Sequence, residues 1–142
     1  MHFSFDELSG LHLDVLKEIG TIGAGNAATS LSKLLVKRID MNVPEVKISE
    51  FNMIESILGS GDTLVAGVYL QFEGEIKGNV LFILDTKSAK NLASLLLGTK
   101  QDNESKDEFY AGFSELEASA LEEIGNILIS SYLNAISSFT GL

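Results

Sequence analysis

Apolar residues recur at helical spacing in two long segments, one near each end of the chain. Residues 11–38 predict the first helix, because their apolar side chains return every three or four positions and share one face. The members of that face are Val15, Ile19, Ile22 and Leu34. Residues 114–139 predict the second helix, with Ser114 and Glu117 at the spacing of a capping box. These two segments are therefore expected to be the main helices.

The middle of the chain has the composition and alternation of strands. Residues 64–72 and 75–84 predict two strands joined as a hairpin by a tight turn at residues 73–74. A short helix is then predicted, with Thr86 as its cap and Gly98 at its end. The order of these elements predicts an α+β domain in which both long helices pack on one face of an antiparallel sheet.

The segments around the hairpin carry weaker patterns. Residues 43–48 read as a short strand, with Pro44 at its start or on a sheet edge, where a missing N–H matters least. Residues 51–58 predict a helical turn. Residues 99–108 are polar and acidic, and they predict a loop.

A seven-residue sequence occurs in both long helices. LKEIGTI at residues 16–22 aligns with LEEIGNI at residues 121–127. A glycine costs about 1 kcal/mol relative to alanine inside a helix, so its recurrence between the same neighbours needs another reason. The sequence predicts an internal pseudo-repeat within a single domain over residues 1–142. Its first unit covers about residues 11–98, and an incomplete second unit begins at about residue 114.

The composition excludes several classes of protein. The chain has 142 residues, with 10 Lys and Arg against 20 Asp and Glu, for a formal charge of −10. Such a surface repels phosphate backbones and anionic lipid, which excludes general binding of nucleic acid or membrane. The absence of cysteine and the presence of only two histidines exclude thiolate and multi-histidine metal centres. With no signal peptide pattern at the N-terminus, we expect a cytoplasmic protein without a metal or cofactor of its own.

Each long helix carries a stripe of polar residues away from its apolar face. The first stripe consists of Asp14, Glu18, Thr21 and Gly25, and the second stripe of Ser119, Glu123, Asn126 and Ser130. Their common spacing of +4, +3 and +4 keeps each set on one side of a helix. A solvated helix face explains one such stripe. Two stripes that share the repeat indicate surfaces that bind a partner.

The spacing within the stripes resembles the signature of a known family. The pattern Asp/Ser-x3-Glu-x2-Asn-x22-Pro is similar to that of the CheC/CheX/FliY phosphatases of bacterial and archaeal chemotaxis. The sequence LKEIGTIGAGNAATSLSKLL followed by VPEV is most similar to the CheC branch. The resemblance covers nearly the whole chain. It implies a CheC-like fold and removal of the phosphoryl group from the aspartate of the response regulator CheY.

The first stripe matches this signature with one departure. It reads Asp14-x3-Glu18-x2-Thr21-x22-Pro44, so the spacing is complete, but Thr21 stands where the family has asparagine. A threonine is shorter, and its single hydroxyl cannot reproduce the geometry of a carboxamide. The resemblance therefore implies a degenerate site at Glu18 and Thr21, weak or inactive, with Asp14 helping to dock the partner.

The second stripe has the catalytic residues of the signature. It reads Ser119-x3-Glu123-x2-Asn126, and its proline would lie beyond Leu142. The resemblance implies that Asn126 orients the attacking water, that Glu123 pairs with a lysine of the regulator, and that Ser119 supports docking. It also implies that the divalent metal belongs to CheY. One intact site predicts weak phosphatase activity.

Two other roles follow from the same resemblance. The chain could be a non-catalytic adaptor that binds the receptor deamidase CheD, or a structural relative at the flagellar switch. Because the second unit is incomplete, the last helix is expected to lack a sheet partner of its own. An uncovered apolar face is hazardous in solution, so we also expect a homodimer.

Overall fold

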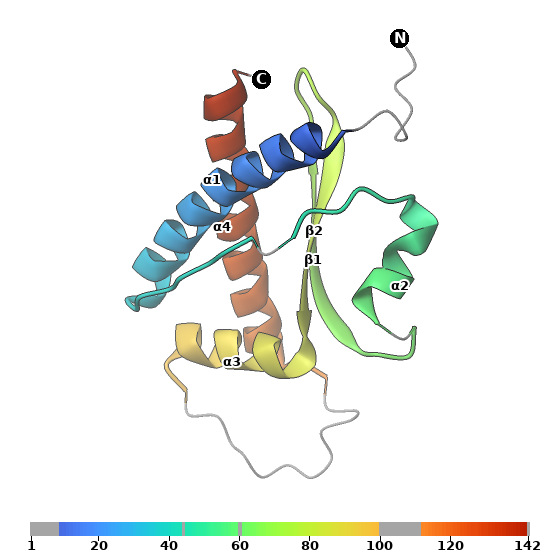
Figure 1. Cartoon of the computed structure of the whole chain (residues 1–142). Coiled ribbons are helices and arrows are strands. Elements are labelled where there is room, and N and C mark those ends of the chain that lie inside the picture. The colour runs from blue at the N-terminus through green and yellow to red at the C-terminus, as the bar shows by residue number, and fades with distance from the viewer. Residues whose placement is uncertain (1–8, 44, 60, 100–111, 142) are drawn as a thin grey trace.

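Helices surround a single β-hairpin in the computed structural model, which describes residues 9–43, 45–59, 61–99 and 112–141. The elements in chain order are α1 (Gly10–Leu35), the 3-10 helix η2 (Phe51–Met53), α2 (Ile54–Leu58), β1 (Val65–Phe72), β2 (Gly78–Asp85), α3 (Thr86–Leu97) and α4 (Glu115–Thr140). Figure 1 shows α1 crossing α4, with α3 below them and the hairpin beside α4. The predicted α+β class is confirmed.

α1 ends three residues earlier than its apolar pattern predicts. Val36 adopts the left-handed conformation, with φ 51°, and its N–H donates to the carbonyl oxygen of Ser32. This geometry terminates the helix, because a left-handed residue cannot continue a right-handed turn. Lys33 lies within the last turn of the helix, whereas Lys37 and Arg38 lie beyond its end.

The predicted capping box of α4 is confirmed. The N–H of Glu117 donates to Oγ of Ser114 at 3.2 Å, and the N–H of Ser114 donates to Oε2 of Glu117 at 2.8 Å. At α3 the cap is Asp85 and not Thr86, because the Asp85 carboxylate accepts from the N–H and the hydroxyl of Ser88. These two hydrogen bonds lower the pKa of Asp85 below its ordinary value.

The predicted hairpin is confirmed, and the predicted strand at 43–48 is wrong for its described residues, 43 and 45–48. β1 and β2 pair in antiparallel register from Val65 opposite Asp85 to Phe72 opposite Gly78. Among the described residues these are the only two strands. Without a neighbouring strand the segment cannot form a ladder of hydrogen bonds, whatever its side-chain pattern. Pro44 lies outside the described residues.

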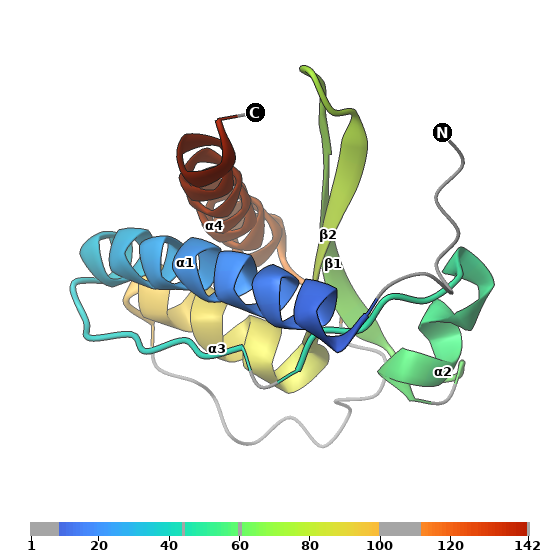
Figure 2. The same cartoon turned by 45° about the horizontal axis from the view of Figure 1, so that its top comes forward.

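α4 contacts the hairpin directly, and α1 is joined to it through α4. A Cβ built on Gly125 of α4 would lie 2.6 Å from Cβ of Val68 in β1, so helix and strand approach as closely as a glycine allows. α4 contacts both strands, whereas α1 contacts α4 and α3 but neither strand (Figures 1 and 2). Of the two long helices predicted to pack on the sheet, α4 therefore does so, whereas the prediction is wrong for α1, whose neighbours are α4 and α3.

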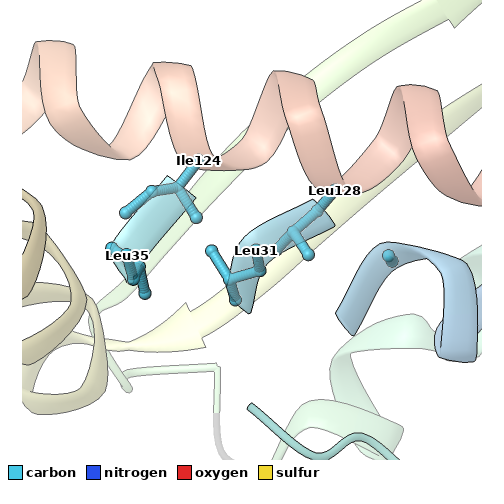
Figure 3. Close-up of a cluster of buried hydrophobic side chains, with 5 residues drawn as sticks. Leu31, Leu35, Ile124 and Leu128 are labelled. Carbon is cyan, nitrogen blue, oxygen red and sulfur yellow. The ribbon is translucent and has the colours of Figure 1, made fainter. Parts of the chain in front are cut away.

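The core lies where α1 crosses α4. Ile124 of α4 is fully buried, and it packs with Leu128 against Leu31 and Leu35 of α1 (Figure 3). A second cluster joins α3 to the start of α4; its buried members are Ala89, Ala93, Ala120 and Leu121. The apolar faces are only partly buried, because Val15 and Leu116 are exposed. The buried half of α1 thus begins at Gly20.

Replacing Ile124 by alanine is expected to lower the free energy of unfolding by about 2–5 kcal/mol, because the truncation leaves a cavity between α1 and α4. Urea denaturation followed by circular dichroism measures the loss. Leu116→Ala is the control on the same helix: its side chain is 69% exposed, so we expect a change within about 0.5 kcal/mol. Equal losses in the two variants would contradict the assigned core.

Candidate functional site

The second stripe lies on the surface of α4. Ser119, Glu123 and Ser130 are exposed, and Asn126 is half-buried. The buried residues Ile124, Gly125 and Leu128 occupy the other side of the helix, where they meet α1 and the hairpin. Packing therefore fixes which side of α4 faces outward. As a result, a carboxylate and a carboxamide one turn apart face solvent.

Neither side chain of this pair is engaged within the described part of the chain. No hydrogen bond or ion pair there involves the carboxylate of Glu123 or the carboxamide of Asn126. A carboxamide can accept a hydrogen bond through its oxygen and donate two through its nitrogen. A free carboxylate binds a lysine or arginine of another molecule. The pair can thus hold a water and a cation at the same time.

The first stripe also lies on the surface, but its Thr21 hydroxyl is engaged in a hydrogen bond. Asp14, Glu18, Thr21 and Gly25 are all exposed. The hydroxyl of Thr21 donates to the carbonyl oxygen of Lys17 at 2.8 Å, one turn back in the same helix. Its only hydrogen is therefore used within α1, as is common for threonine in a helix. Sequence reasoning identified Thr21 as a departure but did not predict this bond.

Tyr132 of α4, which the sequence did not single out, packs against the glycines of α1. The ring of Tyr132 lies over Gly23, where a Cβ would come within 2.6 Å of Cδ2. Its hydroxyl lies beside Gly20, at 3.5 Å from a Cβ built there. Burial raises the pKa of Tyr132 above its ordinary value. The available signal was the cluster of glycines at residues 20, 23 and 25, because a helix permits a close approach where it has no side chain, but this signal does not identify the approaching residue.

A polar contact follows where the same two helices cross. The hydroxyl of Ser131 donates to Oγ of Ser30 at 2.7 Å, in a partly buried position. Asn26 and Asn134 line the open groove beside this pair. This hydrogen bond joins α1 to α4 at Ser30, which lies about two turns after Gly23 in α1. The stripes themselves remain on separate helices.

The described residues hold no group of three His, Cys, Asp or Glu side chains that could bind a metal ion. Within the same residues, no helix is long and apolar enough to cross a membrane.

Comparisons with known proteins identify similar sequences and a similar structure. The model of the CheC-like family matches residues 11–48 and 116–142. CheY-P phosphatase CheC of Bacillus subtilis (strain 168) is 36% identical over 97% of this chain and 64% of its own length. Flagellar motor switch phosphatase FliY of the same organism is 27% identical over 93% of this chain and 33% of its own length.

The structural comparison agrees with the sequence comparisons. The X-ray crystal structure of Thermotoga maritima FliY matches 96% of this chain with a TM-score of 0.75 and 29% identity. This chain covers 65% of that one. The chain thus spans less than two thirds of the length of each of these relatives.

Replacing Glu18 or Glu123 by glutamine is expected to change the free energy of unfolding by less than about 0.5 kcal/mol, because neither carboxylate has a described partner in the fold. Urea denaturation measures both. Ser114→Ala, which removes the cap of α4, is the positive control and should cost about 1 kcal/mol. A loss of that size in either glutamine variant would show that its carboxylate supports the fold.

Proposed function

Because this chain matches the model of the CheC-like family, we propose that it hydrolyses the aspartyl phosphate of a CheY-type response regulator through Glu123 and Asn126. The observation that carries the proposal is the second stripe. It presents a carboxylate and a half-buried carboxamide one turn apart on an outward face of α4, and neither group has a partner among the described residues. The Bacillus subtilis relative that shares this part of the chain is named a CheY-P phosphatase.

The chemistry asks little of the phosphatase beyond positioning. An aspartyl phosphate is an activated acyl phosphate. Attack by water at phosphorus forms a P–O bond and breaks the bond to the carboxylate oxygen. Phosphate leaves with the oxygen of the water, a proton is released, and the aspartate is restored. The carboxamide oxygen of Asn126 would accept from the water and aim it in line.

The remaining residues of the second stripe would bind the regulator. The carboxylate of Glu123 would pair with a lysine beside the phosphoryl group of the regulator. This ion pair would fix the position of α4 along its axis relative to that group. Ser119, one turn earlier and exposed, would support that docking. The divalent metal of the reaction is proposed to reside on the regulator.

The first stripe is proposed to dock a partner without catalysing hydrolysis. Thr21 is too short to reach as far as a carboxamide, and its hydrogen is held by the carbonyl oxygen of Lys17. Glu18 and Asp14 are exposed, so they remain able to bind a cationic partner. One competent stripe of two supports the proposal of a weak phosphatase.

This difference between the stripes also supports a second proposal, an adaptor role. An adaptor needs a surface that binds a partner without catalysis, and the first stripe would serve as such a surface. The partner would be the deamidase CheD or an assembly at the flagellar switch. Association as a homodimer is a separate proposal. It rests on apolar residues that α1 leaves exposed, since Leu11 and Val15 are 71% and 50% exposed.

Asn126→Ala is expected to lower kcat for hydrolysis of phosphorylated CheY on the order of 10²-fold, because the attacking water loses its orientation. Release of inorganic phosphate in single-turnover reactions measures the rate. Asn134→Ala, an exposed asparagine two turns further along α4, is the matched control and should keep the wild-type rate. Full activity in Asn126→Ala would overturn the assignment.

Thr21→Asn is expected to create a second competent site. In the wild-type background we expect about a twofold gain in kcat, because two equivalent sites then act on separate regulators. In the Asn126→Ala background the substitution should restore measurable hydrolysis. The same phosphate-release assay measures both. No recovery, with helix content unchanged by circular dichroism, would show that the first stripe lacks more than the carboxamide.

A further inference from the structure

Gly125 lies between the two proposed catalytic residues in sequence and faces away from them in space. Its direction is about 130° around the helix from the midline of Glu123 and Asn126. A Cβ at this position would lie 2.6 Å from both Cβ and Cγ1 of Val68 and 2.7 Å from Cγ2. Ordinary carbon contacts are about 3.5–4.0 Å, so a methyl group here would require a shift of about 1 Å.

α4 cannot make that shift freely, because the preceding residue is held from another direction. Ile124 is fully buried against Leu31 and Leu35 of α1. On the hairpin side the obstacle is Cβ of Val68, which is attached directly to the backbone of β1 and cannot swing aside. α4 is therefore clamped at two consecutive residues, one packed on α1 and one on β1. A displacement at Gly125 must distort the turn of helix that carries the site.

We propose that Gly125 is a positioning residue, whose missing side chain sets the orientation of Glu123 and Asn126 through contact with Val68. This inference rests on the proposed phosphatase function of that pair. A misplacement of about 1 Å in a reaction that depends on positioning can cost on the order of 10²-fold in rate. The carboxylate that docks the regulator tolerates more movement than the carboxamide that aims a water, because charge attraction falls off slowly with distance.

The same glycine in the other copy of the repeat has no such role. A Cβ on Gly20 would meet the hydroxyl of Tyr132 at 3.5 Å and the methyl groups of Val43 at 3.8 and 3.9 Å. These are ordinary contacts, so an alanine fits there. Gly20→Ala is therefore a matched control: it makes the same chemical change in the same sequence context, without the obstacle.

The test compares kinetics for phosphorylated CheY in the wild-type chain, Gly125→Ala and Gly20→Ala. We expect kcat of Gly125→Ala to fall about 10²-fold with KM changed less than about threefold, and Gly20→Ala to keep both constants. The swap Val68→Gly with Gly125→Ala, which moves the methyl bulk from one side of the contact to the other, should recover most of kcat. A folded Gly125→Ala variant with wild-type kcat would overturn the inference. If that variant does not fold, the swap carries the test, and an inactive, folded swap overturns it.

A second readout separates this inference from the proposed function. The backbone and carboxamide NMR resonances of Glu123 and Asn126 should shift in Gly125→Ala and stay in place in Gly20→Ala. If the wild-type chain does not hydrolyse phosphorylated CheY, the proposed function fails, and these resonances alone decide the positioning role. Unchanged resonances in Gly125→Ala would refute it.

Discussion

The fold depends on the packing of α4 between two unlike neighbours. One side of this helix presents Ile124 and Leu128 to α1, and the adjoining side presents Gly125 to the hairpin. Among the described elements, α4 contacts α1, α3 and both strands, and α3 likewise contacts α1, α4 and both strands. A helix that is covered on two sides has one side left for solvent, and the second stripe lies there. The exposed pair of side chains thus follows from the packing of the residues between them.

Local features of the chain could be predicted from the sequence, and the partners of each element could not. The hairpin and the capping box at Ser114 follow from short-range pattern, and both are confirmed. The segment 43–48 has the alternation of a strand, but pairing needs a neighbour that no local pattern supplies. The end of α1 depends on the backbone of Val36, a residue whose type disfavours the left-handed conformation it adopts.

The same division applies to the site. Amphipathic spacing was enough to place Glu18 and Glu123 on outward faces, where the structure has them. Two features could not be predicted in this way. The hydrogen bond of Thr21 within α1 depends on the rotamer of its side chain, and the contact of Gly125 with Val68 depends on which helix packs on the sheet. Repetition of the glycine was the one signal of that contact. It could not show that the two copies have different surroundings. The pseudo-repeat and the division of the chain into units stay predictions.

Because burial is unequal along α1, the helical segments that carry the two stripes differ in local stability. None of the ten residues from Gly10 to Ile19 is buried, whereas α4 is anchored by buried residues from Ala120 onward. An unanchored helical segment frays and re-forms at low cost, so its amides exchange with solvent long before the core opens. Asp14 and Glu18 lie in that segment. Binding of a partner to the first stripe would therefore also order one or two turns of α1, and this ordering costs conformational entropy. The second stripe lies on a helix that its buried residues already hold in place.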